Sequence, residues 1–421
     1  MREMKDGGIE WIGNIPASWK SVPMRYLFRE CTTKNRLGQE KTALKFTYGT
    51  IIPKTNFDAN TDDYVANTIM SYTVVHPGVI MINCLNLNYD FVSQRIGLVK
   101  DYGAITSAYL AIEPNNQVLS AYATYQLKSW DAAKAFHNMG IGVRKTLDFS
   151  ELGKKHFVLP TLGEQKNIVA FLDSKCSEID AISADIQKEI ETLEQYKRSL
   201  VFEAISKGIN GEKTANTSSD IWKEIPQSWK LVDIKYLFEI VKRIAGREGY
   251  NILSVTQKGL KVKDISGNQG QIAENYSGYQ FVFPSDYVMN HMDLLTGWID
   301  CSDQFGVTSP DYRVFRLRDK TQNDTEYYKY VMQCCYMCRI FYSLGQGVST
   351  LGRWRLQTSA FMNFKVPVPP LHEQKEIARY LNDKCKEIEL SIEQKRKQLE
   401  LLSAYKKSLI YEYVTGKKEV I

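Results

Sequence analysis

The sequence predicts an α+β protein built from two similar halves, and three observations lead to this prediction. Short apolar runs bounded by Gly, Pro or Asn, which are typical of strands, dominate two segments of the chain. Two long stretches free of proline and glycine carry apolar residues at alternating three- and four-residue steps, the pattern of a coiled-coil helix. The same sequence blocks occur twice in the same order. We therefore expect two mixed α/β domains, each followed by a long helix, with the two helices pairing as an antiparallel coiled coil with pseudo-twofold symmetry.

Length and composition agree with this organisation. A chain of 421 residues suits two domains plus connecting elements. Its contents of hydrophobic residues, 43%, and charged residues, 24%, are close to those of folded globular proteins, which argues against extended disorder. The formal net charge of +6 permits binding to a polyanion without requiring it.

The N-terminal residues and the absence of long apolar runs predict the location of the protein, and the location predicts the state of the cysteines. Residues 1–16 contain charged side chains and no apolar run, and no stretch of about 18 apolar residues occurs, so we expect a cytoplasmic location with no membrane contact. The eight cysteines should then be reduced. Cys335 and Cys338 form a C-x-x-C pair, but the nearest histidines are His291 and His372. We interpret the pair as small apolar residues of a buried helix rather than as a zinc site.

The clearest repeat begins at two similar boxes. Pro160-Thr-Leu-Gly-Glu-Gln-Lys166 returns as Pro369-Pro-Leu-His-Glu-Gln-Lys375, and the match continues without a gap at an offset of 209. Roughly 19 of about 49 aligned positions are identical, which indicates duplication. A second repeat lies upstream, where Ile15-Pro-Ala-Ser-Trp-Lys20 returns as Ile225-Pro-Gln-Ser-Trp-Lys230.

The segments between these repeats resemble each other only faintly. Gly97 and Gly103 can be aligned with Gly297 and Gly306. Strands are expected at 78–82, 96–99 and 109–112. One amphipathic helix is expected in each segment, at 118–136 and at 326–342, followed by a glycine-rich turn at 140–142 and at 345–347.

The long helices are predicted at 164–207 and 373–415. Thr161 and Glu164 have the spacing of a capping box, which marks the start of the first helix. Pro370 replaces the threonine in the second copy, so a proline in the first turn should mark that start. The apolar seam of the first helix should run through Ile182 and Tyr196, and that of the second through Tyr405. The repeated box either marks the junction from domain to helix, which we favour, or contacts a partner.

This alternation of variable segment, P-x-L-x-E-Q box and long helix, given twice, resembles the specificity subunit of Type I restriction-modification systems. The resemblance extends from Ile15 to about Lys417, and the L-x-x-K-C-x-E-I continuation of both boxes is its most specific part. It implies a host-defence protein in which each variable domain reads one half of a split DNA site. The implied organisation is target-recognition domain 1 (1–158), a central helix (159–208), a linker (209–224), target-recognition domain 2 (225–367), and a C-terminal helix and tail (368–421).

The resemblance also implies partners and cofactors. The helices would set the spacing between the half-sites and dock two methyltransferase (M) subunits, through which restriction and translocase (R) subunits join. No cofactor is expected on this chain itself. S-adenosylmethionine, ATP and Mg²⁺ are expected on the partner subunits.

No catalytic constellation is found in the sequence. Gly208-Ile-Asn-Gly-Glu-Lys-Thr214 lacks the spacing and the Gly-Lys step of a phosphate-binding loop, and no G-x-G-x-x-G follows a strand. The five histidines have no metal or triad spacing, so we expect a non-catalytic subunit.

Candidate DNA contacts are the basic, amide and aromatic residues of predicted loops. Arginine can bind guanine, asparagine can bind adenine, and lysine mostly neutralises phosphates. The candidates are Lys34, Arg36, Asn83, Asn86, Asn88, Tyr89, Arg95, Arg144 and Lys145 in the first domain, and Arg243, Arg247, Lys258, Lys261, Lys263, Asn290, Arg353, Trp354 and Arg355 in the second.

Two other classes of function are an enzyme and a protein-binding scaffold. An enzyme would need a fused nuclease or methylase domain, for which the two repeats leave no room. A coiled-coil scaffold with two protein-binding domains fits the architecture and remains the alternative to DNA recognition.

Overall fold

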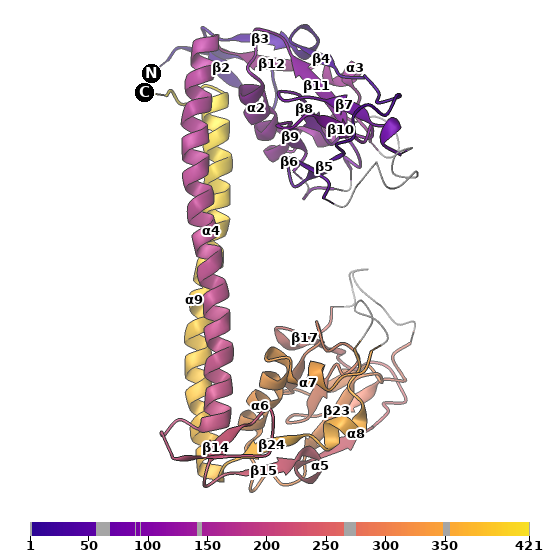
Figure 1. Cartoon of the computed structure of the whole chain (residues 1–421), viewed down its shortest axis with the longest axis vertical. Helices are drawn as coiled ribbons and strands as arrows, with labels where there is room; N and C mark the ends of the chain where they lie inside the picture. The colour runs from indigo at the N-terminus through magenta and orange to yellow at the C-terminus, as the bar shows by residue number, and fades with distance from the viewer. Residues whose placement is uncertain are drawn as a thin grey trace. The chain divides into compact units, whose positions relative to one another are not determined.

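The structure is a computed structural model that describes residues 2–55, 68–88, 90–92, 94–140, 145–264, 275–347 and 354–420. The chain divides into two compact units, drawn in Figure 1. Unit 1 consists of residues 1–186 and 397–421, and unit 2 of residues 187–396. Because the boundaries at 186 and 396 both fall inside long helices, each unit contains part of each helix.

Unit 1 combines a strand-rich domain with the first part of helix α4, Leu162–Lys207, and the last part of helix α9, Leu371–Val414. Its other elements are β1 Met4–Asp6, β2 Asn14–Pro16, β3 Lys20–Pro23, η1 Met24–Tyr26, β4 Phe28–Glu30, β5 Leu44–Thr47, β6 Thr50–Pro53, β7 Thr73–Val75, β8 Ile80–Ile82, β9 Ile96–Leu98, β10 Gly103–Ile105, β11 Leu110–Pro114, α2 Ser120–Ala132, η2 Ala135–Asn138, α3 Phe149–Leu152 and β12 His156–Leu159.

Unit 2 repeats this order of elements. They are β13 Thr214–Asn216, β14 Glu224–Pro226, β15 Lys230–Asp233, α5 Ile234–Leu237, β16 Phe238–Val241, β17 Leu253–Thr256, β18 Gly259–Val262, β19 Gln280–Val282, β20 Tyr287–Met289, β21 Ile299–Cys301, β22 Gly306–Thr308, β23 Arg313–Leu317, α6 Thr325–Met337, α7 Ile340–Ser343, α8 Thr358–Met362 and β24 Lys365–Val368. The mixed α and β composition predicted for both domains is confirmed.

The central sheets of the two units have the same topology. In unit 1 the antiparallel order is β4-β11-β8-β9, and in unit 2 it is β16-β23-β20-β21. Strand β8 is buried along its whole length, which explains its unbroken apolar sequence. The predicted strands at 78–82, 96–99 and 109–112 are confirmed as β8, β9 and β11.

Strand register gives an exact alignment of the two domains. Gly103 pairs with Val75 and Gly306 with Val282 in equivalent strand pairs, so this predicted match is confirmed. The match of Gly97 with Gly297 is wrong, because the strand position equivalent to Gly97 is Asp300. The loop between β20 and β21 is shorter than its counterpart in unit 1, and one-sequence comparison misplaces the glycine.

The amphipathic helices predicted at 118–136 and 326–342 are each broken in two. Lys134 has a φ of 59° and Arg339 a φ of 56°, and both residues separate a longer helix from a single turn. A left-handed backbone at a residue other than glycine costs energy and has no clear sequence signal. The break occurs at the same place in both units, so it is part of the duplicated fold.

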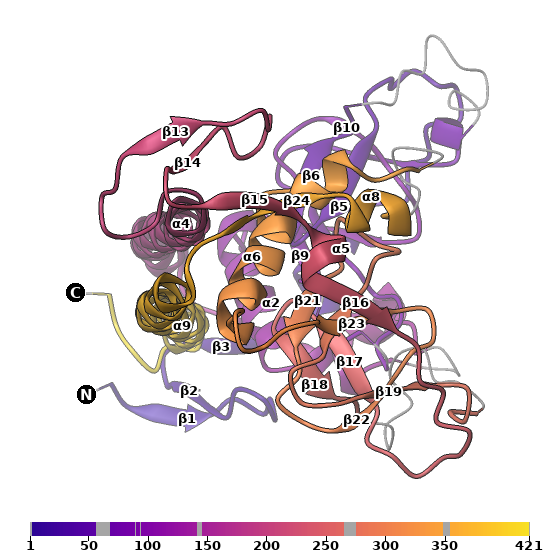
Figure 2. The same ribbon diagram turned by 90° about the horizontal axis from the view of Figure 1, so that it is seen from below.

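The segment predicted as a linker, 209–224, is folded into unit 2. Strand β13 pairs with β14, which lies beside the end of α4 (Figure 2). Trp222 is fully buried, and its indole Nε1 donates a hydrogen bond to the carbonyl oxygen of Lys365 at 2.8 Å. These residues therefore belong to the second domain and do not form a free tether.

Inside unit 2 the two long helices run antiparallel, as predicted. Arg396 of α9 forms an ion pair with Glu194 of α4 at 3.0 Å, and Glu389 of α9 with Lys197 of α4 at 2.5 Å. The residue number falls along α9 as it rises along α4. The C-terminal part of α4, through Ile205, is buried in the same core as the N-terminal part of α9.

Unit 1 shows the same pairing with the roles of the helices exchanged. The rings of Phe171 and Tyr413 lie 4.4 Å apart, and Lys406 forms an ion pair with Asp180 at 2.6 Å. The pairs Lys406–Asp180 and Lys197–Glu389 are related by the repeat. Each core is therefore completed by the end of the helix that follows the other domain.

The predicted seam is only partly correct. Ile182 is 49% exposed, and Tyr196 and Tyr405 are 53% and 56% exposed. A pair of helices covers one narrow stripe on each member. Beyond Ile179 the next buried residue of α4 is Ile190, so the contact stripe of α4 changes phase and leaves Ile182 and Tyr196 outside it. Tyr405 likewise lies outside the buried stripe of α9.

The repeated boxes form the junction between each domain and its helix. The indole of Trp19 donates a hydrogen bond to Glu164 at 2.9 Å, and Trp229 donates to Glu373 at the same distance. Gln165 and its counterpart in the second box are fully buried and bind backbone groups. These contacts support the interpretation of the box as a junction.

The helix starts agree with the predicted caps in one of the two copies. Backbone N–H groups of Thr161 and Glu164 donate to each other's side chains at 3.1 and 3.3 Å, which confirms the capping box. Pro370 precedes the first helical residue, and its carbonyl oxygen accepts from Gln374 at 3.1 Å. It is therefore the N-cap, and the prediction that it lies in the first turn is wrong.

Candidate DNA interface

The loop that follows β8 in unit 1 is fastened to the turn that precedes α3. The backbone N–H of Leu87 donates to Lys145 at 3.2 Å, and that of Leu147 donates to Cys84 at 3.4 Å. The Asn83 side chain accepts from the backbone of Leu85 at 3.1 Å. Two of the segments that contain candidate contacts are thereby joined into one surface.

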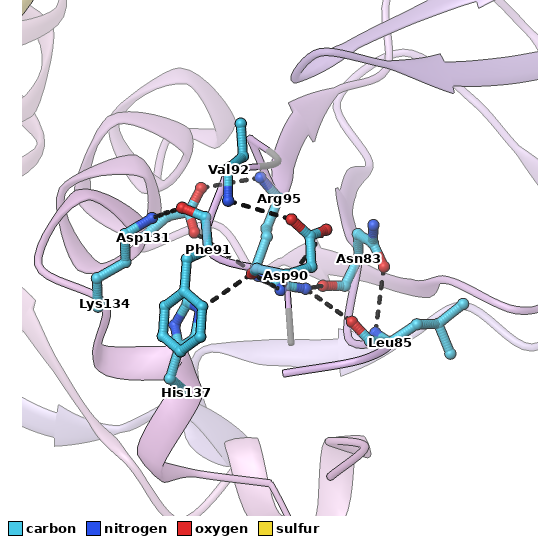
Figure 3. Close-up of polar contacts among 9 residues, drawn as sticks. All are labelled: Asn83, Leu85, Asp90, Phe91, Val92, Arg95, Asp131, Lys134 and His137. Carbon is cyan, nitrogen blue, oxygen red and sulfur yellow. Dashed lines mark hydrogen bonds and ion pairs between the residues drawn. The ribbon is translucent and has the colours of Figure 1, made fainter. Parts of the chain in front are cut away.

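Arg95 holds this loop from the inside, as Figure 3 shows. Its guanidinium donates to the carbonyl oxygens of Asn83 and Leu85, both at 2.9 Å, and of Asp90 at 2.6 Å. Its backbone N–H donates to Asp131 of α2 at 2.8 Å. Because the side chain is fully buried, Arg95 organises the loop and does not present its guanidinium to DNA, contrary to the expectation from sequence.

The equivalent loop of unit 2 is fastened in the same way. The backbone N–H of Leu294 donates to Trp354 at 3.2 Å, and that of Leu356 donates to His291 at 2.9 Å. The Asn290 side chain accepts from the backbone of Met292 at 3.3 Å. The two units therefore anchor different sequences by the same set of backbone contacts.

A basic environment surrounds His291. Burial is the main cause that lowers the pKa of His291 to about 4, and the positive charges of Arg313 and Arg355 lower it further. At neutral pH the imidazole is therefore uncharged. In unit 1 burial raises the pKa of the Asp131 carboxyl, which is only partly offset by the hydrogen bond from Arg95.

Eight of the described candidates are exposed and can reach a ligand without rearrangement. They are Lys34, Arg36, Asn86, Lys145, Arg247, Lys258, Lys261 and Arg355. Asn83, Asn88, Arg243, Lys263, Asn290 and Trp354 are half-buried. Tyr89, Arg144 and Arg353 lie outside the described residues.

Several candidates also have contacts within the protein. Lys34 donates to Thr73 at 3.2 Å, and Arg247 donates to the hydroxyl of Tyr250 at 2.6 Å. Such contacts leave most of an exposed cation's surface available.

Arg243 is more strongly committed. It pairs with the buried carboxylate of Asp286, and its guanidinium lies 4.7 Å from the ring centre of Phe283. We therefore assign Arg243 a structural role.

Sequence reasoning did not select two apolar residues on the Arg95 loop. Val92 is 91% exposed and Phe91 is 55% exposed. A selection of DNA contacts that considers only polar, basic and aromatic residues of a loop does not include Val92, and the sequence alone does not show that Phe91 is exposed. The signal that finds them is the greater length of this loop in unit 1 than in unit 2.

Of the C-x-x-C pair, Cys335 is buried in helix α6, and Cys338 is half-buried and caps the C-terminal end of that helix. Cys334 and Cys335 are fully buried in α6, and the sulfur of Cys334 lies 3.8 Å from that of Cys338. Burial raises the pKa of Cys335 well above its ordinary value, which disfavours the thiolate that zinc requires. Among the residues that the structure describes, no cluster of three metal-ligating side chains occurs.

Comparison with known proteins shows which class of protein the chain is similar to. Residues 226–401 match the sequence model of the Type I restriction modification DNA specificity domain. The Type I restriction enzyme MjaVIII specificity subunit of Methanocaldococcus jannaschii is 25% identical over 338 residues, which cover 76% of this chain and 75% of that protein. The MjaX specificity subunit of the same organism is 24% identical over 442 residues, covering 97% and 96%.

A solved structure agrees in fold. A chain from a study of complex assembly and conformational transition of the type I R-M system has a TM-score of 0.67, with 13% identity, and the match covers 96% of this chain and 99% of that one. The sequence matches show that the chain is similar to Type I restriction-modification specificity subunits, and the structural match shows a shared fold.

In the part of the chain that the structure describes, no helix combines the length and apolarity that a bilayer span requires.

Proposed function

We propose that this chain is the sequence-specific DNA recognition subunit of a Type I restriction-modification complex, with each unit reading one half of a bipartite site. The observation that carries the proposal is the pair of loops fastened by the same backbone contacts, with different side chains in each unit. Backbone contacts that are the same in both units, together with loop side chains that differ, suit two domains that recognise different base sequences. The family match supports DNA as the ligand.

The chemistry of the exposed candidates fits a DNA duplex. Arg36, Lys145, Lys258 and Lys261 can neutralise phosphates, while Asn86 and Arg355 can bind base edges. The net charge of +6 favours the encounter.

A surface that occurs once in each unit supports docking of the same partner twice. In unit 1 the exposed Tyr405 lies near Lys175, which forms an ion pair with Glu178 at 2.8 Å. In unit 2 the repeat-related Tyr196, Lys384 and Glu387 form the same arrangement, with an ion pair of 2.9 Å. Exposed tyrosines are common at the centres of protein interfaces.

We assign these two surfaces to two methyltransferase subunits. The R subunits then join through the M subunits. S-adenosylmethionine, ATP and Mg²⁺ belong to these partners, the present chain is non-catalytic, and the assembly acts on DNA in the cytoplasm.

Binding experiments with the full chain test DNA recognition. The chain is combined with its methyltransferase, the methylated motif is mapped in the host genome, and affinity is measured for duplexes with either half-site scrambled. Loss of affinity with each scrambled half supports a bipartite reader. Binding without sequence preference, or no binding, would instead favour the coiled-coil scaffold.

Exchange of a whole domain tests independent reading. Replacing residues 21–155 with the equivalent segment of a relative should change one half of the methylated motif and leave the other half and the spacer intact. A change in both halves would contradict independent reading.

An insertion into α4 tests the proposal that the helices set the spacer. Four residues inserted near 185–188 nearly preserve the helical phase and add about 6 Å of helix. The spacer should then lengthen by one or two base pairs, since each pair rises about 3.4 Å. An active variant with an unchanged spacer would show that the helices do not set this distance.

A further inference from the structure

The first domain contains a loop insertion that the second domain lacks. The backbone N–H of Asp90 donates to Asn86 at 3.1 Å, and that of Gly297 donates to Asp293 at 2.9 Å, so these turns are equivalent. Arg95 is equivalent to Trp298, as their carbonyl oxygens accept from Asn83 and Asn290. Four residues, 91–94, separate Asp90 from Arg95, whereas Gly297 and Trp298 are adjacent.

The start of the insertion is held by side chains of the single turn η2 and of the residue before it, both of which follow α2. Lys134 donates to the carbonyl oxygen of Phe91 at 2.5 Å. A ring nitrogen of His137 lies 3.1 Å from the carbonyl oxygen of Asp90, and the His137 ring stacks on Phe91 at 4.5 Å. Figure 3 shows these contacts beside Arg95. The start of the insertion is therefore held in place, and the buried Arg95 directly follows it in the chain.

In unit 2 a different pair of residues makes the anchoring contacts that Arg95 and Asp131 make in unit 1. Trp298 replaces Arg95, and Tyr336 of α6 replaces Asp131 of α2. Tyr336 donates its hydroxyl to the carbonyl oxygen of Asn290 at 2.6 Å, and its ring lies 6.2 Å from Trp298. An aromatic pair thus performs in unit 2 the anchoring that an arginine–aspartate pair performs in unit 1.

This difference between the units shows which features the common fold does not require. Unit 2 folds with the shorter loop and an apolar anchor, so the common fold does not require either the insertion or a buried guanidinium. Burial of a charge without full compensation is unfavourable, and here Arg95 Nε and Asp131 Oδ1 face each other at 4.0 Å without a hydrogen bond. The unfavourable burial of the Arg95 guanidinium is explained if it serves to hold Phe91 and Val92 in one conformation.

We propose that the Arg95 loop presents Phe91 and Val92 to double-stranded DNA and thereby contributes to recognition of the first half-site, with Arg95 and Asp131 as positioning residues. This inference rests on the proposed DNA-reading function. Both apolar side chains are exposed, and the loop that carries them is fastened to the basic turn at Lys145 by the backbone hydrogen bond from Leu87. Exposed apolar side chains contact thymine methyl groups in the major groove or enter between base steps.

Substitution of Val92 tests the contact without disturbing the fold, because the side chain is almost fully exposed. In the complex with the methyltransferase, Val92→Ala should weaken binding to the specific duplex about tenfold, since two buried methyl groups are lost. Binding to a duplex with the first half-site scrambled should not change. The control Leu295→Ala alters an exposed apolar residue of the equivalent loop in unit 2. It should leave discrimination at the first half-site intact.

Substitution of Arg95 tests its positioning role. Arg95→Met should reduce discrimination at the first half-site while leaving the second half-site and the salt dependence of binding unchanged. An arginine that contacted phosphate would instead reduce the slope of log affinity against log salt by about 0.9. The exposed Arg36, changed to Gln, provides the comparison for such a contact.

The outcomes separate this inference from the proposed function. A wild-type complex that shows no sequence preference would overturn the proposed function, and with it this inference. A specific wild-type complex whose discrimination is unchanged by Val92→Ala would overturn the inference alone. A reduced salt slope in Arg95→Met would show that Arg95 contacts DNA directly and would overturn its positioning role.

Discussion

Gln165 offers a sharp test of how the junction box stabilises unit 1. Its side-chain oxygen accepts from the backbone N–H of Leu119 at 2.8 Å. Its side-chain nitrogen donates to the carbonyl oxygens of Gln117 at 2.9 Å and Pro160 at 3.1 Å. The side chain is fully buried and therefore joins the start of α2, the end of β12 and the start of α4.

Two substitutions separate the contributions of these contacts. Gln165→Ala removes the side-chain partner of three backbone groups, and because two of these hydrogen bonds are only part-buried, we take the lower end of the cost, about 1 kcal/mol for each group, and expect a loss of about 3 kcal/mol. For a unit of this size, that corresponds to a fall in Tm of about 6–12 °C. Gln165→Glu keeps the acceptor but directs a carboxylate at two carbonyl oxygens, so at pH 7 it should destabilise more than alanine does.

The pH dependence of the glutamate variant has a definite sign. Burial beside carbonyl oxygens raises the pKa of the introduced carboxyl above its ordinary value of about 4.3. The native state then binds a proton more readily than the unfolded state, so stability increases as the pH falls from 7 toward 5. The alanine variant should lack this recovery.

Urea denaturation followed by tryptophan fluorescence measures these differences. Gln374→Glu is the matched variant in unit 2, where the amide accepts from Asp324 at 2.7 Å and donates to Pro369 at 2.9 Å. Its longer third bond, 3.4 Å to Gln322, predicts a somewhat smaller loss. A Gln165→Ala variant within about 0.5 kcal/mol of the wild type would refute the structural interpretation of the box.

Three further predictions concern pH, surface charge and DNA affinity. Because the pKa of His291 is lowered, the wild type should lose stability as the pH falls from 6.5 toward 4, by at most about 1.4 kcal/mol per pH unit. His291→Cys, which introduces the residue found at the equivalent position Cys84, should remove this loss. Urea midpoints at pH 7 and 4.5 measure the difference. Lys406→Glu should lower the free energy of unfolding by less than about 1 kcal/mol, because it breaks an exposed ion pair with Asp180. Adding Asp180→Lys should restore the lost stability, as a double-mutant cycle would show. Arg36→Gln should lower the salt slope of DNA binding by about 0.9, and an unchanged slope would exclude a phosphate contact.

The parts of the fold that the sequence predicts are those with strong local signals. The long helices follow from apolar periodicity, and the start of α4 follows from the reciprocal contacts of Thr161 and Glu164. The helix breaks at Lys134 and Arg339 do not follow from the sequence, because neither residue type favours a left-handed backbone. The exposure of Ile182 depends on where the partner helix lies, which a single helix pattern does not contain.

The candidate site is harder to predict because exposure is a property of the fold. An arginine in a polar loop is usually solvated, and nothing local distinguishes Arg95 from Arg36. The difference arises from three carbonyl oxygens that the loop turns inward, and from Asp131, which is distant in sequence. Comparison of the two repeats supplies the missing information, since it shows which loop is longer and which anchor has changed.

The same comparison indicates where partner surfaces should be sought. The most similar blocks of the repeat include Glu164 and Gln165, yet both side chains are used inside the protein. Their recurrence is therefore explained by folding and says nothing about a partner. Tyr196 and Tyr405 also recur, but their side chains are exposed, and no core requires them. A position that is repeated, exposed and aromatic is best explained by a contact made twice, and this reasoning favours the helix surface over the box as the docking site that we propose for methyltransferase subunits.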